Sequence, residues 1–191
     1  VPDDTLAFAR DAAARMIADL SPEQTSRIAG LGIAIPGYLW EWGQTFGAEA
    51  EKIAGWRDRD IQAELGAHFA FPVFQQNDAS CACGAELVFG RQALPPNFLY
   101  FYVGYFIGGG VVLNGRLYTG PTGNAGAIGP IPVPGATGDI QQLIELASLS
   151  GLEKTLAAAG GDAAGSRSGA EIWDSPTHWT MDPGILERWM D

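Results

Sequence analysis

The stretch FPVFQQNDA, residues 71–79, decides the fold of this chain. Its apolar start, Phe71 to Phe74, predicts a short strand, and Asn77-Asp78 then introduce an alanine-rich helix that reaches about Phe89. In open α/β sheets, ligands bind at the carboxyl ends of strands, so Asn77 and Asp78 are candidate ligand-binding residues. The alternative is that both side chains only cap the following helix, as Asn and Asp often do.

Helix and strand patterns also alternate before this stretch. Apolar residues recur at helical spacing over 6–20, and a short apolar run over 28–35 predicts a buried strand that ends at Pro36-Gly37. A second helix is expected over 58–69. This order of elements is typical of the α/β class.

The carboxyl half predicts a strand over 98–103, which is rich in aromatic and branched residues. Asn114-Gly115 lies between two apolar runs and predicts a hairpin, because both central turn residues need positive φ. One face of residues 140–147 is apolar at helical spacing, which predicts a helix there, and another helix is expected from about Ser150.

Composition narrows the function classes. Of 191 residues, 47% are hydrophobic and 17% charged, as in a globular protein with a sizeable core. The formal net charge of −11 leaves too little positive charge for a large nucleic-acid or membrane-binding face. No apolar run approaches the roughly 18–20 residues of a membrane span. With two cysteines and no disulfide framework, we expect a cytoplasmic protein.

Two short motifs are weak signals when taken alone. Cys81-Ala82-Cys83-Gly84 looks like half a zinc site, but the chain holds only two Cys and two His, so buried cysteines on a core helix are the favoured interpretation. Gly108-Gly109-Gly110 would allow a phosphate to approach the backbone closely, but a tight bend between strands would need the same glycines.

The order of the motifs resembles the ROK family of bacterial sugar kinases and sugar-responsive repressors. The residues that carry the resemblance are Leu31 to Gly37, Gly55-Trp56, Phe71 to Ala79 with Glu86, Asn114 to Gly120, and Asn124 to Gly129. The resemblance implies an actin-like, ribonuclease-H-like ATPase fold, incomplete in this chain. It places the remainder of an amino-terminal α/β lobe at residues 1–95 and part of a carboxyl-terminal lobe at residues 96–191.

The resemblance also assigns roles. Asp78 matches the base that takes a proton from the sugar hydroxyl in the family's kinases, and Asn77 and Gly37 match sugar-binding positions. Gly104, Gly108 and Gly110 match the family's second phosphate-binding loop.

Departures from the family pattern argue against phosphoryl transfer. Tyr105 and Phe106 replace a Thr and a Gly of that loop, and bulky rings there should block phosphate. Ala127 and Pro130 replace a Glu and a His that supply the sugar with polar partners. The family's zinc motif has no cysteine counterpart over 133–144, so no metal is expected.

The favoured hypothesis is therefore a kinase-like ligand-sensing and dimerisation region of a ROK-type transcriptional regulator. We expect a sugar or polyol ligand, a homodimer, no cofactor, and DNA contact only through a domain before Val1. The alternatives are a divergent ATP-dependent sugar kinase and a degenerate scaffold without a ligand. The favoured interpretation also expects a longer protein, with the family's first phosphate loop before Val1 and its adenosine-binding segment after Asp191.

Overall fold

The computed structural model describes residues 2–38, 40, 53–135, 138–158, 184, 187 and 189. The chain divides into two compact units, Val1–Cys81 and Ala82–Asp191. The lobe boundary expected at residue 95 stays a prediction. Among the described residues, no helix has both the length and the apolar character needed to cross a membrane.

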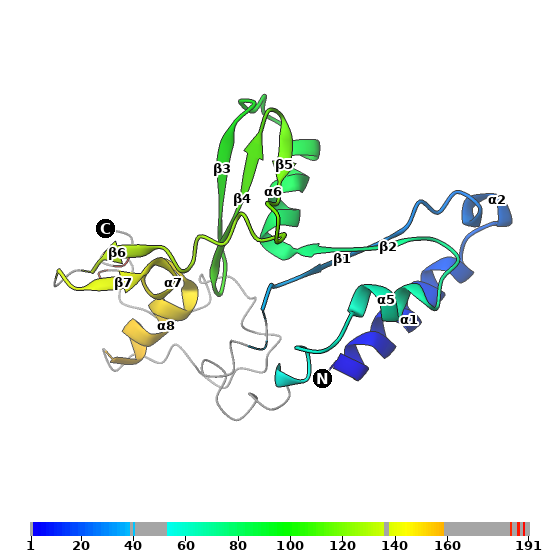
Figure 1. Cartoon of the computed structure of the whole chain (residues 1–191), viewed down its shortest axis with the longest axis horizontal. Helices are drawn as coiled ribbons and strands as arrows, with labels where there is room; N and C mark the ends of the chain where they lie inside the picture. The colour runs from blue at the N-terminus through cyan, green and yellow to red at the C-terminus, as the bar shows by residue number, and fades with distance from the viewer. Residues whose placement is uncertain are drawn as a thin grey trace. The chain divides into compact units, whose positions relative to one another are not determined.

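The first unit is a two-stranded parallel sheet with helices packed on one face (Figure 1). Its elements are α1 (Pro2–Ala18), α2 (Pro22–Thr25), β1 (Leu31–Ile35), α5 (Ile61–Gly66) and β2 (Val73–Asn77). Ile61 and Leu65 of α5 pack on Val73 of β2, and Leu6 of α1 and Ile33 of β1 border this core. The three helix and strand patterns predicted before β2 are therefore confirmed, with α5 shorter than the 58–69 expected.

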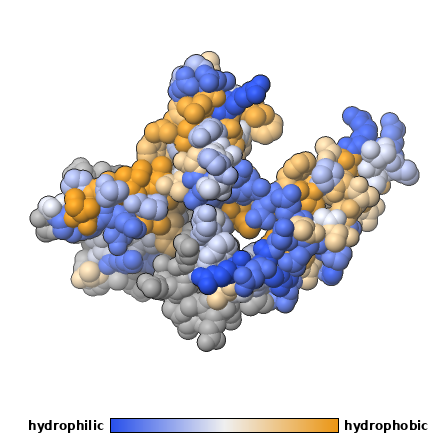
Figure 2. Space-filling view, viewed as in Figure 1, coloured by the Kyte–Doolittle hydropathy of each residue, from blue (hydrophilic) through white to orange (hydrophobic). Residues whose placement is uncertain are grey.

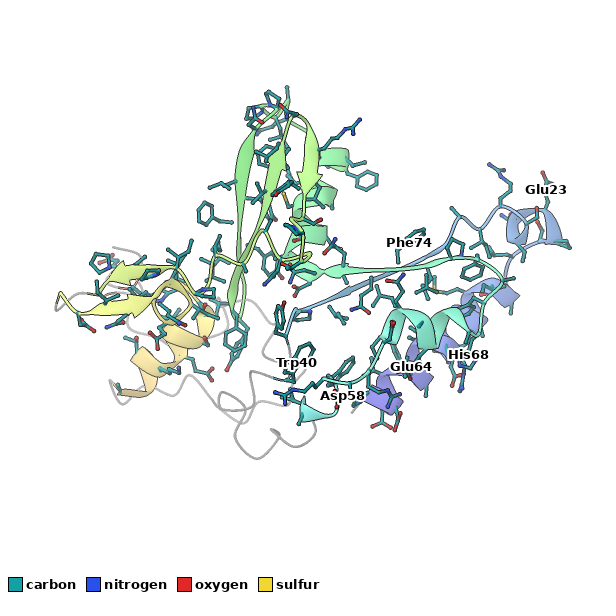
Figure 3. The ribbon with its side chains drawn as sticks, in the orientation of Figure 1. Glu23, Trp40, Asp58, Glu64, His68 and Phe74 are labelled. Carbon is teal, nitrogen blue, oxygen red and sulfur yellow. The ribbon has the colours of Figure 1, made fainter. Side chains whose placement is uncertain are left out.

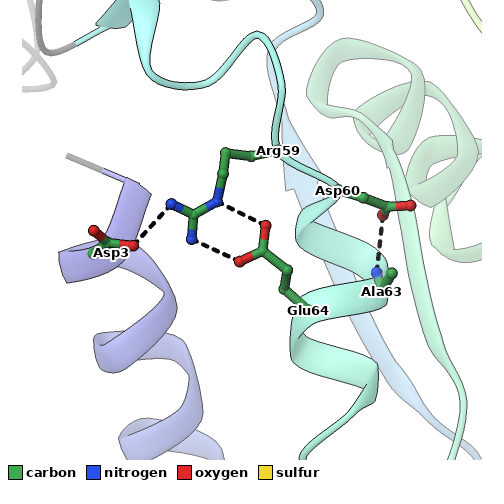
Figure 4. Close-up of polar contacts among 5 residues, drawn as sticks. All are labelled: Asp3, Arg59, Asp60, Ala63 and Glu64. Atoms are coloured by element: carbon green, nitrogen blue, oxygen red, sulfur yellow. Dashed lines mark hydrogen bonds and ion pairs between the residues drawn. The ribbon is translucent and has the colours of Figure 1, made fainter.

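An arginine clamp fixes α1 against α5 (Figure 4). Arg59 donates through Nη1 to Asp3 at 2.8 Å and through Nη2 and Nε to the Glu64 carboxylate at 2.6 and 2.7 Å. Asp60 caps α5, because its carboxylate accepts from the Ala63 amide. The hydrogen bond from Arg59 lowers the pKa of Glu64. The clamp holds the helices that support β1 and β2.

The second unit contains a three-stranded antiparallel sheet in the order β3-β4-β5. The strands are β3 (Phe98–Val103), β4 (Ile107–Leu113) and β5 (Arg116–Tyr118). The hairpin predicted at Asn114-Gly115 is confirmed, with φ of 54° and 71° at the two turn residues. On β3 every second residue is exposed, and Figure 2 shows hydrophobic atoms over this part of the chain.

Helix α6 (Asp78–Phe89) packs on this sheet through small residues. Cys83 is fully buried, and a Cβ added to Gly110 would lie 2.6 Å from its Sγ and closer still to its Cβ. A Cβ added to Gly84 would lie 3.4 Å from Leu117 Cδ2 of β5, which is an ordinary contact distance. Burial raises the pKa of the Cys83 thiol, and both cysteines are free. The interpretation of Cys83 as a small core residue is thus supported.

The helix predicted over 140–147 is only partly correct. Residues Ile140–Gln142 form β7, which pairs antiparallel with β6 (Pro132–Pro134), and α7 runs only over Leu143–Leu146 before α8 (Leu149–Ala158). The Glu145 carboxylate accepts from the Gln142 amide, which starts α7 at Leu143. A strand was expected over Phe71–Phe74. The observed strand, β2, begins at Val73 and continues to Asn77.

Candidate functional site

Asn77 and Asp78 lie where β2 ends and α6 begins. The Asn77 Oδ1 atom accepts from the Ser80 amide at 3.0 Å, which makes Asn77 the N-cap of α6. Asp78 Oδ1 accepts from the Ala79 amide at 2.8 Å. In the part of the chain that the structure describes, Asn77 Nδ2 and Asp78 Oδ2 have no hydrogen-bond partner. Each residue therefore caps the helix with one atom and keeps a second polar atom for a ligand.

Gly37 lies at the same end of the sheet. The parallel register pairs Ile35 with Asn77, and Gly37 follows Ile35 by two residues. Because the carboxyl ends of parallel strands meet at one sheet edge, the fold brings Gly37, Asn77 and Asp78 together there. Asp78 is half-buried, so its carboxylate can accept a hydroxyl while still contacting solvent.

Two aromatic residues at this edge were not singled out from the sequence. Tyr38, directly after Gly37, has a φ of 53°, which is rare for a bulky residue. Its ring meets that of Trp40 edge to face, with ring centroids 5.4 Å apart. Figure 3 labels Trp40 beyond the carboxyl end of β1. No periodic pattern marks either residue, because both lie in a turn.

The second candidate set is the turn between β3 and β4, in the other unit. Gly104 and Tyr105 use their carbonyl oxygens to accept from the amides of Leu149 and Ser150, the first residues of α8, at 3.1 and 3.0 Å. The Tyr105 hydroxyl lies 3.3 Å from Glu153 Oε2 and donates to it. A helix N-terminus is a natural anion site, but here the turn's own carbonyls occupy its first amides.

A buried serine also binds the chain at the end of this turn, where β4 begins. Ser148 is fully buried, and its Oγ accepts from the Ile107 amide at 2.7 Å. The turn therefore directs two carbonyl oxygens and a phenol hydroxyl toward α8, which contributes the Glu153 carboxylate, and the amide of Ile107 is already bound. None of these contacts provides the open cradle of amides that a phosphate requires.

The matching glycines do not all lie in this turn. Gly108 and Gly110 lie within strand β4, and only Gly104 lies in the turn. A Cβ on Gly109 would lie 2.7 Å from the Tyr100 carbonyl oxygen and 3.1 Å from Ile128 Cδ1. At Gly109 and Gly110, close packing explains the absence of a side chain. The role of Gly104, Gly108 and Gly110 as a phosphate-loop remnant stays a prediction.

Residues 125–130 pack beside β4 and contain no polar side chain. Gly126, Ile128 and Gly129 are buried, and the Cβ position of Gly126 faces the backbone of Gly109. Ala127 and Pro130 are exposed. The two positions that would carry a carboxylate and an imidazole therefore offer no hydrogen-bonding side chain.

Neither a metal cluster nor an apolar groove in the first unit competes as a site among the described residues. Within the described ranges no three His, Cys, Asp or Glu side chains gather where they could hold a metal ion. A groove of about 450 Å³ runs between α1 and β1, lined by residues such as Ala13, Met16 and Ile33. Its lining is almost wholly apolar, so it lacks the polar side chains that orient a hydroxyl-rich ligand.

Comparison with known proteins gives consistent matches. The family model described as "ROK family" matches residues 2–151. The xylose repressor of Bacillus subtilis (strain 168) is 29% identical over 117 residues, which are 59% of this chain and 28% of the repressor. A glucokinase of Halalkalibacterium halodurans is 36% identical over 108 residues, 56% of this chain and 32% of the kinase.

The solved structure of a ROK family transcriptional regulator, a homologue of the E. coli MLC protein, has a similar fold. It aligns over 96% of this chain and 45% of its own chain, with a TM-score of 0.59 and 22% identity. The chain thus spans about a third or less of the two curated relatives and under half of this regulator. Both repressors and sugar kinases occur among the similar proteins.

Proposed function

This chain belongs to the ROK family, with its actin-like fold, and from that premise we propose that it is the sugar-sensing, kinase-like region of a ROK-type transcriptional regulator. In this proposal the region binds a sugar or polyol at the carboxyl ends of β1 and β2. It does not transfer a phosphoryl group. The signal passes to DNA through a domain outside this sequence.

The observation that carries the proposal is the closed turn between β3 and β4. Its carbonyl oxygens bind the first amides of α8, and the Tyr105 hydroxyl binds Glu153. A phosphate at this turn would meet a carboxylate and lose the amide donors, so both charge and hydrogen bonding oppose it. General-base catalysis by Asp78 could contribute about 10²–10⁴-fold, but only with an oriented phosphate donor.

The polar atoms at the carboxyl ends of β1 and β2 support ligand binding without phosphoryl transfer. In the described chain, the side-chain Nδ2 atom of Asn77 and the second carboxylate oxygen of Asp78 have no hydrogen-bond partner, and Gly37 lies at the same sheet edge. A carboxylate and an amide together can accept and donate to neighbouring hydroxyls. The family resemblance also assigns the sugar a Glu and a His, where this chain has Ala127 and Pro130, so we expect a ligand that has few hydroxyls or that binds weakly.

The second candidate is a divergent ATP-dependent sugar kinase. Asp78 favours it, because the residue type and its position at the strand end match those of the kinase base, and kinases occur among the relatives. The two candidates share the sugar contacts and differ at the turn. Homodimer formation, a cytoplasmic location and the absence of a cofactor belong to the regulator proposal.

The test is calorimetric titration of the 191-residue chain with a panel of monosaccharides. We expect binding of at least one sugar, and a loss of about 10-fold or more in affinity in Asp78→Ala, because a hydrogen bond to a charged group contributes about 1.5–3 kcal/mol. Asp60→Ala is the matched control, since Asp60 also caps a helix but is not one of the proposed sugar contacts. If Asp78→Ala binds the sugar as tightly as the native chain, the contact assignment is wrong.

A further inference from the structure

We propose that Tyr38 and Trp40 form an aromatic platform at the site of Asn77 and Asp78, in which one ring stacks on the apolar face of the bound sugar and the other ring braces it edge to face. This inference rests on the proposed function and adds a specificity element to the same site. Neither residue carries a sugar-binding role in the resemblance. The proposal starts from the backbone, since a bulky residue with positive φ marks a place where the fold imposes a conformation.

The first observation is the backbone conformation of Tyr38. Tyr38 has a φ of 53° directly after Pro36-Gly37, where the chain leaves β1. Its ring is 43% exposed, although it packs edge to face on Trp40 with an angle of 72° between the ring planes. Two aromatic rings that hold each other while remaining accessible are a rigid surface with little conformational entropy left to lose on binding.

The sheet register places this surface near the polar pair. Ile35 pairs with Asn77, so their Cα atoms are about 5 Å apart, and the three steps from Ile35 to Tyr38 span at most about 11 Å. A bound ring and two extended side chains can bridge that separation. Tyr38 therefore lies at the same end of the two-stranded sheet as Asn77 and Asp78.

The chemistry fits a pyranose. A pyranose with equatorial hydroxyls presents hydroxyls at its rim and C–H groups on its faces. Asn77 Nδ2 and Asp78 Oδ2 can form hydrogen bonds with the hydroxyls at the rim. The C–H groups can pack against the electron-rich face of an aromatic ring. The site then selects ligands by the shape of their apolar face as well as by their hydroxyls.

The experiment titrates the 191-residue chain with D-glucose, D-xylose and D-galactose. Galactose carries an axial hydroxyl that interrupts one apolar face. We expect Trp40→Ala and Tyr38→Gly to weaken binding of the preferred sugar about 3- to 10-fold and to reduce discrimination against galactose. Trp40→Phe should restore most of the affinity, because it keeps a ring. The Tyr38→Gly variant removes the ring while tolerating the positive φ.

Phe74→Ala is the matched control. Phe74 is another exposed aromatic residue of the same sheet, 59% exposed, and it lies on β2 away from the strand end (Figure 3). It should leave binding unchanged. Circular dichroism checks each variant, and if Tyr38→Gly does not fold, the comparison of Trp40→Ala with Trp40→Phe decides.

Two outcomes separate this inference from the proposed function. If Asp78→Ala loses binding while Trp40→Ala and Tyr38→Gly bind like the native chain, the platform is refuted and the sugar site stands. If the native chain binds none of the three sugars, the site and the platform are both refuted.

Discussion

Replacing Gly110 by alanine tests whether the glycines of β4 serve packing. The added Cβ would lie 2.6 Å from Cys83 Sγ, about 1 Å inside normal contact, and Cys83 is fully buried. Neither partner can swing away, because one is on a central strand and the other on the helix that covers it. We expect Gly110→Ala to lower the free energy of unfolding by about 1–3 kcal/mol, as overpacking does.

Urea unfolding followed by circular dichroism measures the effect, with Gly32→Ala as the control. Gly32 is also a strand glycine, but nothing lies within 4 Å of its Cβ position. Alanine there should be neutral or stabilise by about 0.4–1 kcal/mol, because it lowers the entropy of the unfolded chain. If Gly110→Ala were as stable as Gly32→Ala, the packing explanation would be wrong and a ligand-related role for Gly110 would gain weight.

Three further predictions concern single contacts. Ser148→Ala should destabilise the protein by about 1–3 kcal/mol in urea unfolding, because the buried Ile107 amide loses its acceptor, and an unchanged midpoint would contradict this. Arg59 lowers the pKa of Glu64 below its usual 4.5, so this contact stabilises the fold above that pH and is lost as the pH falls. Glu64→Gln should therefore flatten the fall in Tm between about pH 5 and 3, and an identical acid slope in both proteins would refute the clamp. Asn77→Ala should cost about 1 kcal/mol of unfolding free energy while Asn77→Asp keeps most of it, and equal losses would exclude the N-cap role.

Local rules made part of the fold predictable from sequence. The hairpin at Asn114-Gly115 follows from the backbone freedom of the two residues, and its φ values agree. The start of α6 follows from the Asn-Asp pair, which caps the helix as one interpretation expected. The prediction of a helix starting at Ile140 was wrong for residues 140–142, because a short apolar pattern fits both the helical and the strand period. Pairing of Ile140 with Pro134 makes this segment a strand.

Contacts between distant residues could not be predicted. Tyr105 and Phe106 were identified as bulky replacements, but the bond from Tyr105 to Glu153 joins residues 48 apart in the chain. The Ile107–Ser148 bond spans 41 residues. The platform residues lie in a turn, where only the observed φ of Tyr38 draws attention to them. In each case the tertiary structure supplies information that no local pattern holds.

The most direct test of the central claim is an ADP-release assay of the 191-residue chain with ATP and each sugar that it binds in calorimetry. The proposal predicts sugar binding without sugar-dependent ADP release, because the turn at Tyr105 is closed by α8 and offers no phosphate cradle. Asp78→Asn serves as the comparison, since it keeps the shape of the side chain and removes the base. Sugar-dependent ADP release by the native chain that disappears in Asp78→Asn would contradict the claim and identify the chain as a kinase.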